Sequence, residues 1–193
     1  MVPSCSPSET LRNPLPPGWN GSGALPLEID VGCHKGLFLV EMAGLYPAHN
    51  FLGVEFQSER VQRTQKKIRT LARANAAVVQ ADGLEALQGL PDHCVDVIHV
   101  LFPDPWPKRR HYIRRLVQTP FFVTALRVLK PGGLLRLVTD DADYAAAMAA
   151  TAPDFPALVP FDADHRAYPL TEFQKKFLTD GRPVHRLILK KIT

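Results

Sequence analysis

One stretch limits the possible folds more than any other: an apolar strand that turns through two glycines into an apolar helix. Residues 25–31 are predicted as the strand, residues 32–36 (Gly-Cys-His-Lys-Gly) as the turn, and residues 37–43 as the helix, which ends near Pro47. A unit of this kind opens the doubly wound α/β sheets that bind nucleotides.

The alternation of short apolar runs and amphipathic segments continues along the chain. Further strands are predicted over residues 51–55, 77–82, 95–101, 134–139, 155–161 and 184–192, and helices from Ser58 and over 83–90, 121–129 and 142–150. This order predicts a single doubly wound, mostly parallel seven-stranded sheet with helices on both faces, in the α/β class. The last strand is expected to be antiparallel and to close the sheet as an edge strand.

Composition limits the domain and its surroundings. Residues 1–24 are rich in Pro, Ser, Gly and Asn and are predicted as a flexible extension, with the domain over residues 25–193. No apolar run approaches a membrane span and no signal peptide is recognised, so we expect a cytoplasmic protein without a membrane partner. Three scattered cysteines, Cys5, Cys33 and Cys94, disfavour both a disulfide framework and a zinc site, and no metal is expected. A monomer and a homodimer both remain open.

Acidic residues mark the carboxyl ends of five predicted strands: Asp30, Glu55, Asp82, Asp104 and Asp140. In open α/β sheets this edge holds the ligand. A single acid at a strand end is often a helix cap, but five in register favour one shared crevice. An acid after the second strand can accept hydrogen bonds from ribose hydroxyls, so Glu55 indicates a nucleoside cofactor, which Gly32 and Gly36 would let approach the backbone.

The glycine turn disfavours a dinucleotide. Its two glycines are separated by three residues, and His34 stands where the dinucleotide fingerprint has its middle glycine. A cationic cofactor without phosphates fits an acidic crevice better. S-adenosylmethionine is such a molecule: its adenosine suits Glu55 and Asp82, and its sulfonium and amino groups suit Asp30.

A proline-rich loop, residues 102–107, follows the fourth predicted strand. Its three prolines alternate with Asp104 and Trp106, and their fixed φ makes the loop stiff and non-helical. A basic cluster comes next: Lys108, Arg109, Arg110, His111, Arg114 and Arg115. With the net charge of +4, this cluster favours a polyanionic partner whose phosphates it would bind without reading sequence. The basic side of the second helix, from Arg60 to Arg73, is either a solvated surface or a second RNA contact.

Together these motifs resemble those of the tRNA (guanine-N7-)-methyltransferases of the bacterial type, from about residue 27 to the end of the chain. The match comprises the glycine turn, Gly-Val-Glu at 53–55, Gln-Ala-Asp at 80–82, Leu-Lys-Pro-Gly-Gly at 129–133, Thr-Asp at 139–140 and Thr-Glu-Phe-Gln at 171–174. Its most specific part is Leu-Phe-Pro-Asp-Pro-Trp-Pro-Lys-Arg-Arg-His at 101–111. The resemblance implies methyl transfer from S-adenosylmethionine to N7 of a guanine in the variable loop of tRNA.

The resemblance also implies roles for single residues. The cofactor site is expected to be lined by Asp30, Glu55, Asp82 and Asp104, with Gly32 and Gly36 alongside. The guanine or its nucleotide is expected to meet Lys108, Asp140, Thr171, Glu172, Phe173 and Gln174. The tRNA is expected to bind Arg109, Arg110, His111, Arg114 and Arg115. Guanine N7 carries a lone pair and no proton, so no general base is needed, and the hypothesis for Asp104 is that its carboxylate stabilises the charge that develops on the purine.

Several points stay open. His34 replaces the usual middle glycine of the first motif, and Gln174 stands where the family usually has Glu. Glu28 rivals Asp30 as the first acid if the register slips by two residues, and Trp106 either stacks on the base or packs the loop. The alternative function is a non-catalytic tRNA-binding module on a methyltransferase fold. Methylation of an exocyclic amine is disfavoured, because that chemistry usually carries Asn/Asp-Pro-Pro-Phe/Tyr at the position of the proline loop.

Overall fold

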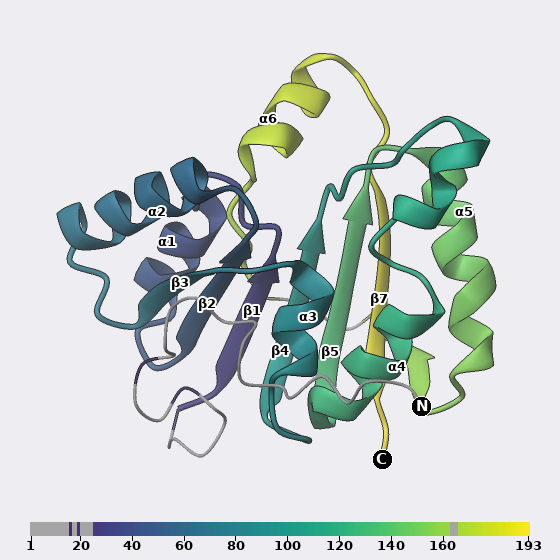
Figure 1. The fold of residues 1–193 in the computed structure, drawn as a ribbon, viewed down its shortest axis with the longest axis horizontal. Helices are drawn as coiled ribbons and strands as arrows, with labels where there is room; N and C mark the ends of the chain where they lie inside the picture. Colours follow the sequence, from purple (N-terminus) through teal and green to yellow (C-terminus); the bar gives the residue numbers. More distant parts are fainter. Residues whose placement is uncertain (1–15, 17–18, 20–24, 163–165) are drawn as a thin grey trace, which may run out of the picture.

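The computed structural model describes Pro16, Trp19 and residues 25–162 and 166–193 (Figure 1). Its centre is one seven-stranded sheet with the strand order β3-β2-β1-β4-β5-β7-β6. The strands are β1 (Leu27–Val31), β2 (Asn50–Glu55), β3 (Ala76–Gln80), β4 (Val95–Leu101), β5 (Leu129–Thr139), β6 (Leu158–Pro160) and β7 (His185–Lys191). The predicted fold class is confirmed, because β1 to β5 pair in parallel and β7 runs antiparallel to both of its neighbours.

One detail of the predicted sheet was wrong. The strand expected over 184–192 does not close the sheet, since β7 lies between β5 and β6 and pairs with both. The edge is β6, which has only three residues and ends at Pro160. A proline has no N–H to donate, so a short strand that ends in one is suited to an edge and unsuited to the centre.

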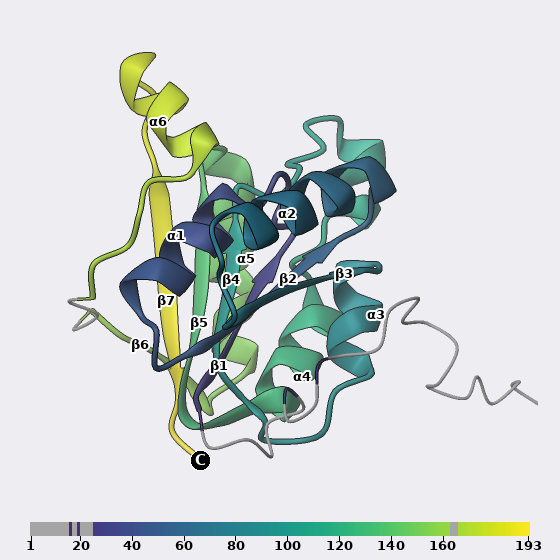
Figure 2. The ribbon, with the colours of Figure 1, turned by 90° about the vertical axis from the view of Figure 1, so that its left-hand side faces the viewer.

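Helices cover both faces of the sheet. They are α1 (Leu37–Leu45), α2 (Ser58–Thr70), α3 (Gly83–Gln88), α4 (Thr119–Val128), α5 (Ala142–Thr151) and α6 (Glu172–Thr179), with the short 3-10 helices η1 (Arg109–Arg114) and η2 (Ala152–Asp154). Figures 1 and 2 show α1 and α2 on one face and α3, α4 and α5 on the other. Alternate residues of β1 serve the two faces: Ile29 and Val31 join the core under α3 and α4, whereas Glu28 and Asp30 point the other way.

The first part of the chain is described at two residues. Trp19 is buried in the main core, and its backbone N–H donates to the carbonyl of Pro16. The extension predicted over residues 1–24 otherwise lies outside the described residues. Among those that are described, no helix is long and apolar enough to cross a membrane.

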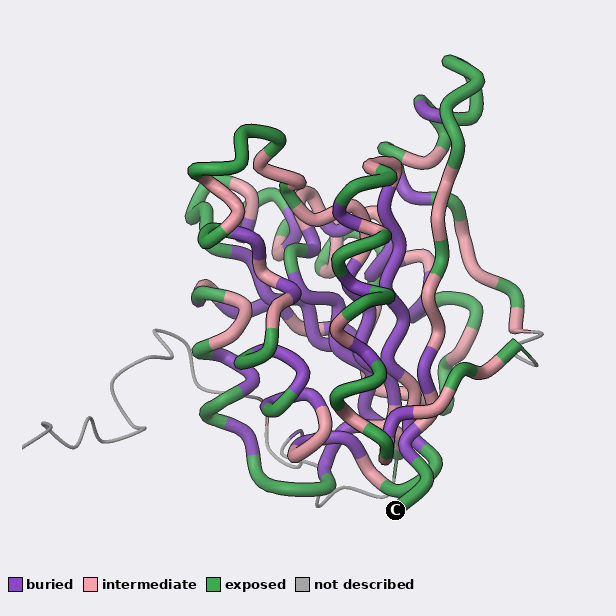
Figure 3. The backbone as a smooth tube through the Cα atoms, turned by 90° about the vertical axis from the view of Figure 1, so that its right-hand side faces the viewer, coloured by how far each residue is buried: buried purple, intermediate pink, exposed green. Residues whose placement is uncertain are grey.

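The helix α6 was not among the predicted elements. Thr171 caps its first turn by accepting a hydrogen bond from the N–H of Gln174. Phe177 is the one buried residue of the helix, and Figure 3 shows α6 as a mostly exposed projection from the body of the molecule. It stands at the edge toward which the parallel strands point (Figure 1). A short helix with so little buried surface depends on a few contacts for its position.

Candidate active site

A cleft with a volume of about 680 Å³ opens at the carboxyl ends of the parallel strands. All five acids predicted to mark those ends line it: Asp30, Glu55, Asp82, Asp104 and Asp140. They meet because parallel strands deliver their carboxyl ends to the same edge of the sheet. The cleft also takes in Gly32, Thr171, Glu172, Phe173 and Arg114.

Asp30 lines this cleft, and none of the cations that the structure describes pairs with it. Its side chain is almost completely buried, and no hydrogen bond to its carboxyl group is found among the described residues. Burial, and after it the charge of Glu55, raise the pKa of Asp30 to about 7. A buried carboxylate is stabilised when a positive charge comes close, so this position suits a cation that arrives with a ligand.

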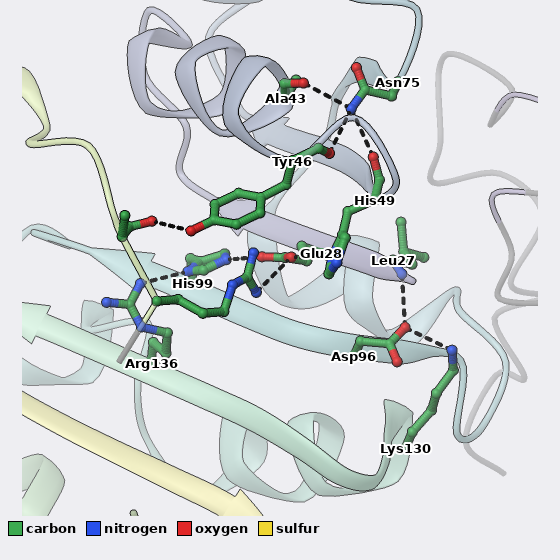
Figure 4. A network of polar contacts seen from close by, with 12 residues as sticks. Leu27, Glu28, Ala43, Tyr46, His49, Asn75, Asp96, His99, Lys130 and Arg136 are labelled. Carbon is green, nitrogen blue, oxygen red and sulfur yellow. Dashed lines mark hydrogen bonds and ion pairs between the residues drawn. The ribbon is translucent and has the colours of Figure 1, made fainter. Parts of the chain in front are cut away.

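Glu28, the rival acid, is on the same face of β1 but outside the cleft. It is fully buried, and its carboxylate contacts Nδ1 of His49 at 2.7 Å, Nε2 of His99 at 2.9 Å and the guanidinium of Arg166 at 2.9 Å (Figure 4). Burial tends to raise the pKa of Glu28, but the contacts with His99 and Arg166 outweigh it and lower the value to about 2. Of the two acids, therefore, Asp30 lines the cleft, whereas Glu28 is paired within the protein.

The neighbours of His99 define its protonation. Nε2 lies against the Glu28 carboxylate and must donate, whereas Nδ1 lies 3.0 Å from the Arg136 guanidinium and must accept. His99 is thus a neutral imidazole protonated on Nε2, in keeping with a pKa that burial lowers. Arg136 stacks on the ring of Tyr168 at 3.3 Å, so this network anchors the segment that leads into α6.

The two glycines of the turn have a left-handed backbone. Gly32 and Gly36 have φ of +81° and +69°, and a Cβ on Gly36 would lie 2.3 Å from Cγ2 of Thr64. His34 also has a positive φ, +53°, and its backbone N–H donates to the Glu55 carboxylate at 3.0 Å. His34 therefore keeps the left-handed backbone that a glycine would adopt at this position. This backbone costs a non-glycine residue about 1 kcal/mol.

Two acids at the cleft also organise the backbone. Glu55 accepts hydrogen bonds from the N–H groups of His34 and Gln57, and Asp82 caps α3 by accepting from Leu84 and Glu85. The sequence analysis missed Phe56, which lines the cleft and is 72% exposed. The available signal was its place directly after the acid of the second strand.

The proline loop is held in an unusual conformation. Phe102 and Trp106 have φ of +55° and +45°, and Oδ1 of Asp104 accepts a hydrogen bond from the N–H of Trp106 at 3.1 Å. The indole lines the cleft and also packs within the loop, with the Arg114 guanidinium 5.0 Å above it and the His111 ring edge-on at 5.8 Å. Backbone strain of this kind gathers at functional sites.

Arg115, expected to bind RNA, differs from the rest of the basic cluster because it is buried and paired within the protein. Its buried guanidinium donates to the carbonyl of Pro105 at 2.8 Å and to the Asp143 carboxylate at 2.7 Å. It also stacks between the rings of Tyr112 and Tyr144. These contacts tie the proline loop to α5. Four other cations of the cluster are exposed: Lys108, Arg109, Arg110 and Arg114.

Part of the cleft wall comes from α6, its N-cap Thr171 and the loop that follows the helix. Thr171, Glu172 and Phe173 line the cleft, whereas Gln174 and the exposed Lys108 are not among the lining residues. The sequence analysis missed Arg182, which lines the cleft and forms an ion pair with Asp140 at 2.5 Å. No sequence signal pointed to it, because the pair joins two loops that are far apart in the chain.

The described residues contain no group of three or more His, Cys, Asp or Glu side chains that could hold a metal ion.

The family model described as "Putative methyltransferase" matches residues 24–187. A tRNA (guanine-N(7)-)-methyltransferase of Nitrosospira multiformis is 33% identical over 175 residues, which cover 88% of this chain and 76% of the relative. One of Syntrophotalea carbinolica is 32% identical over 166 residues, covering 83% and 72%. The chain belongs to the tRNA (guanine-N7-)-methyltransferase family.

Solved structures share the fold at lower identity. The aminoglycoside resistance methyltransferase NpmB1 aligns with a TM-score of 0.60 and 20% identity over 90% of both chains. A SAM-dependent methyltransferase of Aquifex aeolicus aligns with a TM-score of 0.59 and 17% identity, covering 88% of this chain and 85% of that one. These likenesses confirm the predicted Rossmann-like methyltransferase fold.

Proposed function

We propose that this protein transfers a methyl group from S-adenosylmethionine to N7 of a guanine in the variable loop of tRNA. The observation that carries the proposal is the single cleft lined by Asp30, Glu55, Asp82, Asp104 and Asp140, which opens beside exposed cations in a member of this family. A tRNA substrate is consistent with the cytoplasmic location expected from the sequence.

The cleft residues fit this cofactor in charge and hydrogen bonding. When bound, S-adenosylmethionine supplies a methyl group activated by a sulfonium. Asp30 provides a buried carboxylate for the cofactor's positive charge, and Glu55 provides a carboxylate for ribose hydroxyls. Asp82 also lines the cleft and is assigned to the adenosine, and the absent side chain of Gly32 leaves the backbone open to the ligand. Gly36 is not among the lining residues, and its missing side chain makes room for Thr64 of α2.

Asp104 is the residue that we assign to catalysis. Guanine N7 attacks through a lone pair and loses no proton, so the protein must orient the base and stabilise the positive charge that develops on it. The carboxylate of Asp104 lines the cleft in a loop stiffened by prolines and held by Arg115, so it requires little reorganisation during the reaction. Binding of the nucleotide is assigned to Lys108, Asp140, Thr171, Glu172, Phe173 and Gln174.

The exposed cations beside the cleft are assigned to the tRNA backbone. Arg109, Arg110 and Arg114 belong to η1 or to its ends, with His111 partly exposed between them. Cations on one exposed segment bind phosphates and orient the nucleic acid without reading its bases. Selection of the guanine then falls to the cleft.

The test is incubation of tRNA transcripts with methyl-labelled S-adenosylmethionine, followed by digestion and identification of the labelled nucleoside. We expect label in 7-methylguanosine, at a position in the variable loop. A transcript made with 7-deazaguanosine, which lacks the N7 lone pair, is the matched control and should stay unlabelled. Label in any other nucleoside would refute the proposed reaction. Binding of tRNA without any binding of the cofactor would favour the non-catalytic alternative.

A further inference from the structure

His34 of the glycine turn lines the cleft, and its side chain contacts α6. Of the described residues, five besides glycines have positive φ, and three of those line the cleft: His34, Phe102 and Trp106. Glycine adopts this backbone without strain, so the imidazole of His34 is present at an energetic cost. Strain of this kind is a reason to look for a function of the side chain that causes it.

The imidazole contacts the first turn of α6. Its ring centroid lies 5.2 Å from that of Phe173 at an interplanar angle of 57°, and its Nδ1 lies 3.8 Å from the Glu172 carboxylate. These contacts matter because Phe177 alone of the α6 residues is buried. A helix with so few anchors takes its position from each contact that it makes.

The backbone of the same residue faces the cofactor side of the cleft. The N–H of His34 donates to the Glu55 carboxylate, the group assigned to the ribose. His34 thus connects two parts of the proposed site. Its backbone belongs to the cofactor loop, and its side chain contacts the base-binding segment Thr171–Gln174. We propose that His34 is a positioning residue, which sets α6 over the cleft and so places the base-binding segment relative to the cofactor loop. The base-binding part of this inference rests on the proposed function.

The contact acts through ring packing at neutral pH. Burial lowers the pKa of the His34 imidazole, and the cations that face it, Arg60 on α2 and Lys35 in the turn, lower it further. The facing carboxylates of Glu172 and Glu55 oppose this shift without reversing it. The neutral ring therefore packs on Phe173, and the effect of removing it should be the same at pH 7 and pH 8.5.

Two substitutions separate the side chain from the backbone strain. His34→Gly removes the imidazole and the strain, whereas His34→Ala removes the imidazole and keeps the strain. Both keep the N–H that donates to Glu55, so the Kd for S-adenosylmethionine should change less than about twofold. Misplacement of the base-binding segment should lower kcat/KM for tRNA roughly tenfold in both variants. His34→Gly should also melt at a higher temperature than His34→Ala.

Coupling between the two sides of the cleft can be measured directly. Phe173→Ala and His34→Ala should each lower kcat/KM for tRNA roughly tenfold, and the double variant should be about as active as either single variant. Losses that multiply to roughly a hundredfold would show that the two rings act independently and would overturn the inference. A large loss of cofactor affinity in His34→Gly, with normal use of tRNA, would overturn it too.

A readout without methyl transfer keeps this inference apart from the proposed function. In hydrogen–deuterium exchange, amides of residues 171–179 should exchange faster in His34→Gly than in the unchanged protein. If the unchanged protein makes no 7-methylguanosine but this difference is found, the reaction is wrong and the positioning contact stands. Equal exchange in the two proteins would rule out the positioning role, whatever the reaction proves to be.

Discussion

Glu28 and Asp30 are acids on the same face of the same strand, only two residues apart, and the fold treats them in opposite ways. Glu28 has three partners from the protein, and its pKa is about 2. Asp30 has no cation partner within the described part of the chain, and its pKa is about 7. Burial alone does not distinguish them, since both are buried. The difference separates an acid that is paired within the protein from one that lines the cleft, to which we assign the cofactor.

Arg114 and Arg115 repeat the contrast for cations. Arg115 is buried, stacked between two tyrosines and paired with Asp143. Arg114 is exposed at the rim of the cleft, over the ring of Trp106. Of these two adjacent arginines, one is paired within the protein and the other is available to a ligand. The two acids and the two arginines can each be compared by experiment.

The largest effect is expected from Glu28→Ala. Removal of this buried carboxylate leaves the partly exposed Arg166 without its anion and the buried His99 without its acceptor, and breaking a buried pair typically costs about 3–5 kcal/mol. The free energy of unfolding, measured by urea titration, should fall by that amount. The pKa of Glu28 lies below its ordinary value of 4.5, so its stabilisation is complete above that pH and is lost as the pH falls toward 2. If Glu28→Ala were as stable as the unchanged protein, Glu28 would not stabilise the fold as we argue.

The next largest effect is on turnover. Asp104→Asn keeps the shape of the side chain and removes its charge, so kcat should fall roughly 10²- to 10³-fold, as when one preorganised electrostatic group is lost. Stability and tRNA affinity should stay near normal, because the side chain is exposed and belongs to the cleft. Single-turnover kinetics with saturating cofactor measure the rate of methyl transfer. A near-normal rate would show that Asp104 is not catalytic.

Asp30→Asn should weaken cofactor binding and raise stability, whereas Glu28→Ala should lower stability. Loss of one charged hydrogen-bonding group should weaken S-adenosylmethionine binding roughly 10- to 100-fold in calorimetric titration. Because the pKa of Asp30 is raised from 3.8 to about 7, the unchanged protein should lose stability as the pH rises through that interval. The Asn variant should lack this loss and be more stable at neutral pH. Its cofactor affinity should also be less dependent on pH below 7.

The smallest effects are expected at the arginine pair. Arg115→Ala should lower stability by about 1–3 kcal/mol through lost hydrogen bonds to Pro105 and Asp143. Arg114→Ala should leave stability unchanged and reduce the slope of log affinity for tRNA against log salt by about 1. Filter binding over a salt series and thermal melting compare the two variants. If Arg115→Ala changed the salt slope and Arg114→Ala did not, Arg115 would contact the tRNA and the structural role that we expect for it would be wrong.

Much of the fold could be predicted because its signals are local. The strand at Val95–Leu101 has the predicted bounds, and α4, which carries Pro120 in its first turn, was displaced by one or two residues. The errors have non-local causes. β5 begins at Leu129, before the Lys-Pro-Gly-Gly turn, because it pairs with Val95 there and its register shifts before Val97. α6 has only eight residues, and its apolar positions, Phe173, Phe177 and Leu178, are too few to establish a helical period in the sequence.

The sequence by itself determined the alternation of strands and helices, the acids at the strand ends and the stiff basic loop, because periodicity and proline chemistry act between near neighbours. Only the tertiary structure decided which acid faces the cleft, which arginine is buried and what His34 touches. Those outcomes depend on the partners that β4, α5 and α6 bring from distant parts of the chain. A charge takes its role from the groups that surround it, and folding alone assembles those groups.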